Sequence, residues 1–135
     1  MKKSDMSARQ LKDRAAFRKA LGPAGWDFGG WDALFEGGAD LDPEAQAEKR
    51  NRTFDMRLSL YAAERYLLLE LTQRRGPVAV VIRLYPAASL GRLLDAIVSR
   101  SDAINSTNYA DSLRELSPHC GRMLLETTKG LLKLT

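Results

Sequence analysis

The densest alternation of apolar and polar residues lies between Thr53 and Tyr85, and it predicts three β-strands. Apolar residues occupy every second position over 54–61, and the pattern returns over 66–72 and again over 78–85. A period of two is typical of a strand that buries one face. The two breaks between these runs are too short for a parallel crossover, so we expect an antiparallel meander with hairpin connections.

Helical spacing of apolar residues predicts two helices before this meander. The first spans 5–21 and carries a thin apolar stripe of Ala8, Leu11, Ala15, Phe17 and Leu21. The second begins with Asp42 as cap and Pro43 in the first turn, and it should run to about Arg50 or Arg52.

Three more helices are expected after the meander. Ser89 should cap the strongest of them, in which apolar residues recur at intervals of three and four: Leu90, Leu93, Leu94, Ile97 and Val98. The leucine-rich chain after Tyr109 predicts two further helices, divided near Pro118 and Gly121.

The predicted fold is therefore α+β, in the order α-α-β-β-β-α-α-α, with a three-stranded meander over about 54–85 packed against the flanking helices. A length of 135 residues fits one domain, 1–135. Within it we distinguish a basic N-terminal helix or arm over 1–21, an acidic loop rich in glycine and tryptophan over 22–42, and an α+β core over 43–135. We expect Leu69, Val80 and Leu94 to share the core.

Charge alternates in sign along the chain, although the total is only +4. Residues 1–21 carry a net +5, residues 22–48 carry −7 and residues 49–135 carry +6. A protein that only coats nucleic acid has little use for a block of −7. The basic total therefore does not by itself indicate a nucleic-acid partner.

The sequence indicates a cytoplasmic protein that does not insert into a membrane. No apolar run approaches the roughly 18 residues that span a bilayer, and the start of the chain lacks the apolar segment of a signal peptide. The single cysteine, Cys120, agrees with a reducing compartment, since small secreted domains usually carry an even set.

No arrangement of residues predicts an enzyme, a cofactor or a metal. His119 and Cys120 are sequence neighbours, so on a helix their side chains would point about 100° apart and could not form a nucleophilic pair. Asp40, Asp42 and Glu44 could bind a divalent cation, but we interpret them as a helix cap and its first turn. Phosphate-binding and nucleophile motifs are missing from the sequence.

The acidic loop carries the first candidate binding site, formed by Trp26, Phe28, Trp31 and Phe35. Tryptophan is over-represented among residues that dominate the binding energy of protein interfaces. The alternative is that both rings fold back over their own domain. We expect a mixed arrangement, with Trp31 packed, since Phe35 and Leu34 follow it at helical spacing, and with Trp26 presented to a partner.

A second candidate site would bind nucleic acid through two sets of residues. One is the basic arm, with Lys2, Lys3, Arg9, Lys12, Arg14, Arg18 and Lys19; the other is a sheet face, with Arg57, Tyr61, Tyr66, Arg83 and Tyr85. The alternatives are that a second layer of helices covers Tyr66, Leu68, Val81 and Tyr85, or that Arg57, Glu70 and Arg83 form cross-strand charge pairs.

The sequence thus favours a small non-enzymatic protein-binding module, of the adaptor, inhibitor or chaperone-like kind, over a nucleic-acid-binding regulator. Its expected partner is another protein, and a homodimer is compatible with the pattern.

Overall fold

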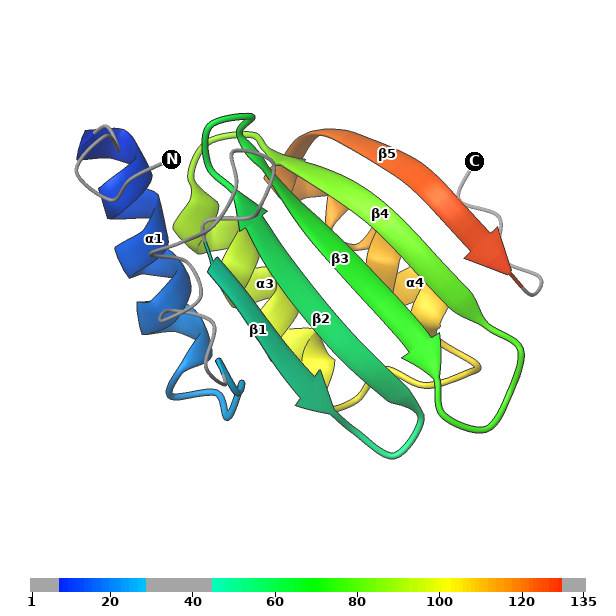
Figure 1. The fold of residues 1–135 in the computed structure, drawn as a ribbon. Helices are drawn as coiled ribbons and strands as arrows, with labels where there is room; N and C mark the ends of the chain where they lie inside the picture. Colours follow the sequence, from blue (N-terminus) through cyan, green and yellow to red (C-terminus); the bar gives the residue numbers. More distant parts are fainter. Residues whose placement is uncertain (1–7, 29–44, 130–135) are drawn as a thin grey trace.

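The computed structural model describes residues 8–28 and 45–129, and shows an α+β fold built on a five-stranded antiparallel sheet (Figure 1). Helix α1 (Ala8–Leu21) is followed by strands β1 (Ala45–Arg50), β2 (Phe54–Tyr61), β3 (Tyr66–Gln73) and β4 (Ala79–Pro86). Helices α3 (Leu90–Ser101) and α4 (Tyr109–Arg114) and a 3-10 turn η2 (Ser117–His119) then lead to β5 (Cys120–Lys129). The strands lie in the order β1-β2-β3-β4-β5.

The predicted meander is confirmed as the three central strands. Leu58 pairs with Leu69 and Leu69 pairs with Ile82, so the apolar residues of each strand share one face of the sheet. These three side chains are at most 4% exposed. Periodicity predicted the inner face correctly, since a shift of one residue would have turned every leucine outward.

The sheet has two strands more than predicted, because the segments expected as the second and the last helix are β1 and β5. In β1, Ala45 and Ala47 are each 1% exposed and face the core, so the segment follows a period of two. Alanine, glutamate and lysine favour helices, but pairing with the edge of β2 overrides this weak preference.

The chain after η2 pairs with β4 along its whole length instead of forming the last predicted helix. Met123 and Leu125 are half-buried against the core, whereas Leu124 between them is 40% exposed. Neighbouring leucines fit either period, and it is the open edge of β4 that selects the strand. The observed order is therefore α-β-β-β-β-α-α-β within the described residues.

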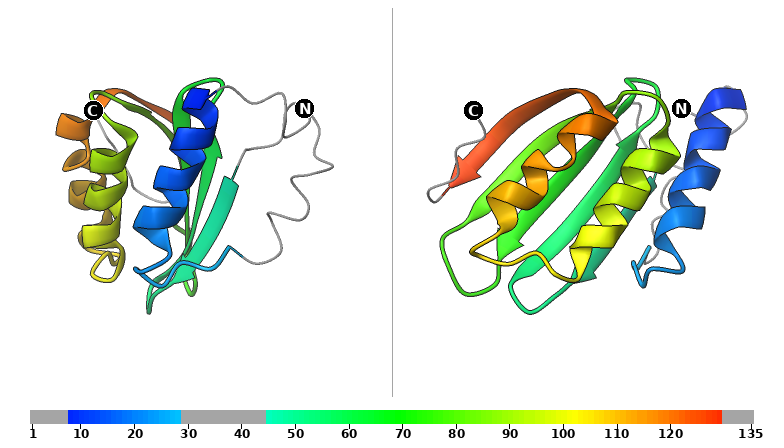
Figure 2. Two further views of the ribbon diagram at one scale, coloured as in Figure 1. Left: turned by 90° about the vertical axis from the view of Figure 1, so that its left-hand side faces the viewer. Right: turned by 180° about the vertical axis from the view of Figure 1, so that it is seen from behind.

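Helices α3 and α4 form a second layer over one face of the sheet (Figure 2). As predicted, Ser89 caps α3: its hydroxyl accepts a hydrogen bond of 3.1 Å from the backbone N–H of Arg92. Leu94 is fully buried and joins Leu69 and Val80 in one core cluster, which confirms that part of the core.

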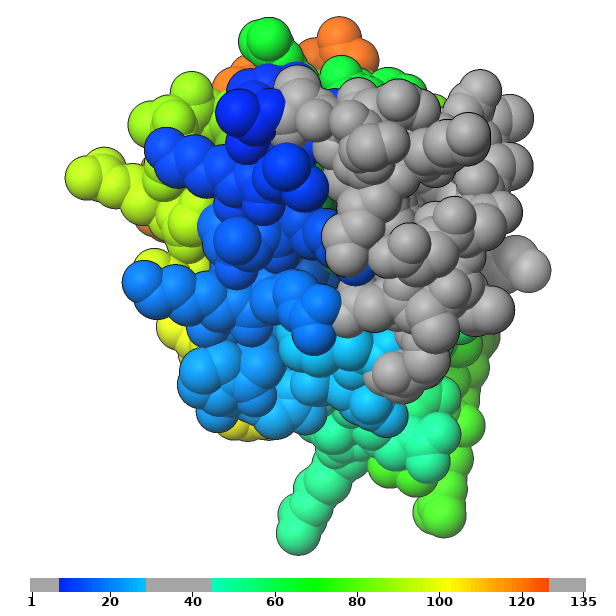
Figure 3. Space-filling model, turned by 60° about the vertical axis from the view of Figure 1, so that its left-hand side comes forward, coloured from blue at the N-terminus to red at the C-terminus, as the bar shows by residue number. Residues whose placement is uncertain are grey.

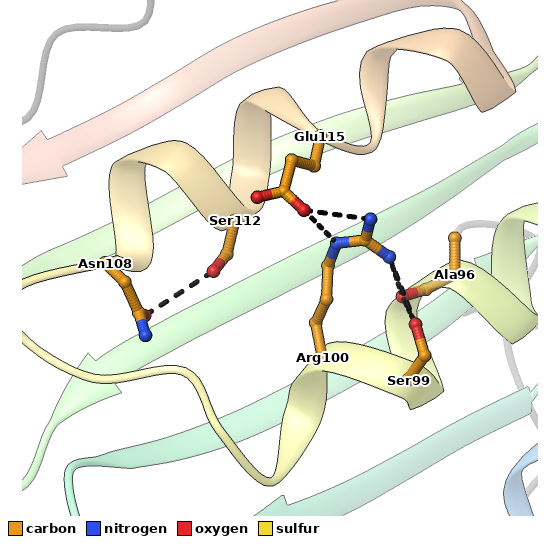
Figure 4. A network of polar contacts seen from close by, with 6 residues as sticks. All are labelled: Ala96, Ser99, Arg100, Asn108, Ser112 and Glu115. Atoms are coloured by element: carbon orange, nitrogen blue, oxygen red, sulfur yellow. Dashed lines mark hydrogen bonds and ion pairs between the residues drawn. The ribbon is translucent and has the colours of Figure 1, made fainter.

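A polar network joins the two helices of this layer across their exposed side (Figure 4). The Arg100 guanidinium donates to Glu115 through Nε at 3.2 Å and Nη2 at 3.0 Å, while Nη1 donates to the Ala96 carbonyl at 2.9 Å. Both bonds to Glu115 end on the same carboxylate oxygen, Oε2. The network thus links the end of α4 to the last turn of α3, and at this exposure its contribution to stability is small.

Asn51 ties the β1–β2 hairpin to the end of α3. Its amide donates to the carbonyls of Ser101 at 3.0 Å and Ile104 at 2.9 Å, and its carbonyl oxygen accepts from the N–H groups of Thr53 and Phe54. One side chain thus satisfies a hairpin turn and a helix end together. This role was not predicted from the sequence.

Helix α1 lies beside α3 at the β1 end of the molecule (Figures 2 and 3). Phe17 and Leu21 are fully buried, as expected for its apolar stripe, but Leu11 is 44% exposed. The buried face instead runs through Gln10 and Arg14, which are 6% and 7% exposed. In the described part of the chain, no helix has the length and apolar character needed to cross a bilayer.

Candidate functional site

The face of the sheet opposite α3 and α4 collects the aromatic and basic residues that the sequence placed there. Tyr61 pairs with Tyr66 across β2 and β3, and Leu68 pairs with Arg83 across β3 and β4. Among the described residues, no helix lies over this face, so the alternative of a second helical layer on that side is not found there (Figure 2). The face also presents three residues of β5 that the sequence analysis missed: Arg122, Leu124 and Glu126.

Three tyrosines and two arginines form a contiguous group at one end of this face. Tyr61 and Tyr66 are stacked, with ring centroids 4.9 Å apart at 17°, and Tyr85 lies 5.4 Å from Tyr66 at 41°. The guanidinium carbons of Arg83 and Arg122 lie 4.8 Å and 4.7 Å from the rings of Tyr66 and Tyr85. Both distances are typical of cation–π contacts. We call these five residues the tyrosine–arginine surface.

The electrostatics of this surface follow from how closely the groups pack. Partial burial raises the pKa of Tyr66, while the charge of Arg83 acts in the opposite direction. The hydrogen bond from Arg83 lowers the pKa of Tyr85, and the same bond raises the pKa of Arg83. Arg83 therefore stays charged, and its contacts hold the rings of two neighbouring strands in place.

Most charges on this sheet face are paired between strands, which is the alternative that the sequence left open. Arg57 contacts Glu48 at 3.1 Å and Glu70 at 3.8 Å. Arg83 is paired with Glu126. Arg122 differs from these, because among the described residues it has no carboxylate partner.

The β1 end of the face has a polar hollow of about 530 Å³. Its charged wall carries both signs: Asp27, Glu48, Asp55, Glu70, Lys49, Arg50 and Arg57. With four carboxylates against three cations, this hollow has no excess of positive charge that would attract phosphate.

The structure shows that Trp26 is buried, so the expectation that it is presented to a partner is wrong. Its side chain is 4% exposed and belongs to the core cluster. After α1, a turn with Gly25 at φ 85° lets the Trp26 N–H donate to the Leu21 carbonyl at 3.1 Å. Asp27 then exchanges two backbone hydrogen bonds with Glu48 of β1, and this pairing holds the indole over the core.

Of the three other aromatic residues of the predicted site, only one lies in the part of the chain that the structure describes. Phe28 is half-buried and meets Phe17 edge-on with ring centroids 6.1 Å apart, while Arg18 lies over its ring. Trp31 and Phe35 lie outside the described residues, and so do the carboxylates of 40–44. The four aromatic residues therefore do not act as one exposed site.

The predicted basic arm is helical over its described part, and only part of it is available to a ligand. Arg9, Lys12, Arg18 and Lys19 are exposed on α1, whereas Arg14 is buried and cannot reach a phosphate. Lys2 and Lys3 lie outside the described residues. A second hollow, of about 230 Å³, is lined by both Arg9 and Tyr66, so it brings one member of each predicted nucleic-acid set together.

Cys120 has none of the features of a nucleophile. It is half-buried, and burial raises the pKa of its thiol to about 11, so the thiolate is scarce at neutral pH. Among the residues that the structure describes, no three His, Cys, Asp or Glu side chains gather closely enough to hold a metal ion.

Comparison with known proteins adds no assignment, because no family model, no curated protein and no solved structure matches this chain significantly.

Proposed function

We propose that this protein is a non-enzymatic binding module that recognises another protein through the tyrosine–arginine surface. Its role would be that of an adaptor, an inhibitor or a chaperone-like protein. The observation that carries the proposal is the contiguous group of Tyr61, Tyr66, Tyr85, Arg83 and Arg122 on the sheet face that α3 and α4 leave uncovered.

The composition of this surface supports a protein interface. Tyrosine and arginine are enriched among the residues that dominate interface binding energy. Here the rings are already stacked and the arginines already placed, so binding would immobilise few further side chains. Leu68 and Leu124 lie among them and add apolar area.

The balance of charge favours protein over nucleic acid as the ligand. Across the whole face, four arginines (50, 57, 83 and 122) stand against four carboxylates, at positions 48, 55, 70 and 126. Nucleic-acid binding depends mainly on uncompensated positive charge, and a balanced face offers little of it. Trp31 and Phe35 stay a predicted second contact with the partner. Trp26 is no longer part of that prediction, because it is buried.

The test is an affinity capture from the native cell with the intact protein as bait. We expect a specific protein to be retained by the wild type and lost by a Tyr85→Ala/Arg122→Ala double variant. The matched control is Lys12→Ala/Lys19→Ala, which removes exposed side chains from α1 and should retain the same protein. If both variants capture the same proteins as the wild type, the surface is not the interface.

Nucleic acid is the second candidate, favoured by Arg122 and by the hollow that joins Arg9 to Tyr66. Fluorescence anisotropy with a labelled single-stranded oligonucleotide tests it. Affinity that falls linearly with the logarithm of salt concentration, and that weakens in Tyr66→Ala, would support this function. An absence of measurable binding at low salt eliminates it.

A further inference from the structure

The hollow of about 230 Å³ lies where the first half of α1, the turn between β2 and β3 and the start of α3 come together. Figures 1 and 2 show these three segments at the same end of the molecule. Its lining includes two arginines from different elements, Arg9 of α1 and Arg65 of the turn. We call it the Arg9–Arg65 hollow.

Arg65 has a backbone conformation that arginine rarely adopts. Its φ is 64°, and among the described residues it is the only one other than glycine with a positive φ. Glycine takes this left-handed conformation without strain, so a turn that only reversed the chain would favour glycine here. Strained residues of this kind are concentrated at ligand sites. An arginine at this position therefore indicates a role for its side chain.

The charges that line the hollow leave an excess of positive charge. Arg9 lies 3.6 Å from Asp13, which also lines the hollow, and such a pair on the surface of one helix is weak. Arg65 has no carboxylate partner in the part of the chain that the structure describes. Glu64, next to it in the turn, is exposed and is not among the lining residues. Two cations against one carboxylate favour an anion of single charge.

Neutral donors lie beside these cations. Tyr66 and Ser89 bring hydroxyl groups to the lining, and the Ser89 hydroxyl accepts a bond of 3.1 Å from the Arg92 N–H, so its own proton can be donated. Ser89 and Leu90 also place the start of α3 in the wall, where the helix dipole adds a partial positive charge.

We propose that the Arg9–Arg65 hollow binds the C-terminal carboxylate of a peptide chain together with its last, apolar side chain. At about 230 Å³ the hollow is smaller than the roughly 300–1,000 Å³ typical of small-molecule and cofactor sites. The rest of its lining is apolar: Leu60, Ala62, Pro86, Ala88 and Leu90. A chain end carries its carboxylate and its side chain on one Cα atom, so a single residue contacts both the arginines and the apolar wall. An acidic side chain would leave much of that wall in contact with water.

The lining favours a carboxylate over a phosphate. A phosphate monoester carries nearly two negative charges at neutral pH, so Asp13 would repel it more strongly than it repels a carboxylate. A nucleic-acid phosphodiester has one charge, but the sugars beside it would leave Leu60 and Leu90 without an apolar partner.

Tyr66 belongs both to this hollow and to the tyrosine–arginine surface, so a partner that covers the surface could place its chain end in the hollow. This use of the hollow rests on the proposed function, whereas carboxylate binding by the hollow does not.

An NMR titration of the intact, isotope-labelled protein tests the site with N-acetyl-leucine, which has a free carboxylate, and with N-acetyl-leucinamide, which has none. We expect the acid to shift the amide signals of Arg65, Tyr66 and Leu90 with a Kd on the order of millimolar, and the amide to shift none of them. Arg65→Gly should weaken binding on the order of tenfold without lowering Tm, because glycine adopts the positive φ more easily. Arg75→Ala is the matched control, since it removes an exposed arginine from the turn at the other end of β3 and should bind as the wild type does.

Equal binding of acid and amide, no shifts at tens of millimolar, or unchanged affinity in Arg65→Gly would overturn the carboxylate site. Tighter binding of inorganic phosphate, or of N-acetyl-glutamic acid α-amide, at the same signals would overturn the choice of a chain end. The affinity capture separates this inference from the proposed function. A protein lost by Tyr85→Ala/Arg122→Ala but retained by Arg65→Gly would support the surface as the interface and overturn the use of the hollow by that partner.

Discussion

Replacing Trp26 tests the account of the core most directly, because the sequence pattern and the structure disagree about this residue. The indole is 4% exposed and lies among core residues. A buried Trp side chain removes on the order of 200 Å² from water, worth about 5 kcal/mol at 25 cal/mol per Å². Its N–H group finds no acceptor within the described residues, which costs about 1–3 kcal/mol.

The two opposing contributions leave about 2–4 kcal/mol for Trp26→Ala to remove. A cavity of about 20 Å³ already lies beside the ring, between Met56, Leu69 and Leu113, and truncation of the ring would enlarge it. For a chain of this length a loss of 3 kcal/mol corresponds to a fall of roughly 10 °C in Tm.

Trp26→Phe separates the two contributions, because it keeps most of the apolar ring and removes the unpartnered N–H. We expect its cost to stay within about 1 kcal/mol. Urea denaturation followed by circular dichroism measures both variants without relying on tryptophan emission. A cost below about 1 kcal/mol for Trp26→Ala would refute the burial argument and return this ring to the surface.

Three further predictions, covering five substitutions, follow from the same structure. Truncating Leu69, Val80 or Leu94 to Ala should each cost about 2–5 kcal/mol in the same urea assay, and losses near zero at all three would mean that they do not form the core. Asn51→Ala should cost about 2 kcal/mol or more, because four hydrogen bonds are lost and two carbonyls at the end of α3 lose their donor; an unchanged Tm would contradict this. Cys120→Ser should leave partner binding intact, whereas the native thiol should react with iodoacetamide slowly below pH 10 and faster once the protein is unfolded. Since the folded pKa is raised to about 11 from an ordinary value of 9.0, the unfolded thiol ionises first, and the stability of the wild type relative to Cys120→Ser should fall as pH rises through that interval.

The local sequence determined those helices and strands whose apolar residues recur with only one spacing, either that of a strand or that of a helix. Residues 54–61 alternate strictly, and Ser89 precedes apolar residues at intervals of three and four, so β2 and α3 were predicted with their buried faces. The hairpins followed from the shortness of the breaks. The side chains on the outer face were also predicted correctly, because alternation assigns both faces of a strand at once.

The tertiary structure decided the elements whose residues fit two patterns. Ala45–Arg50 is rich in helix-forming residues, and Leu124-Leu125 fits a helix as well as a strand; both became strands because β2 and β4 offer unpaired hydrogen-bonding edges. Burial of Trp26 depended on a turn at Gly25 and on two backbone bonds to a residue distant in sequence. Pairing between distant segments has no signature in the local sequence, because it is set by which edge of the sheet each segment reaches. The positions of Arg122, Leu124 and Glu126 on the outer face were therefore evident only in the folded chain.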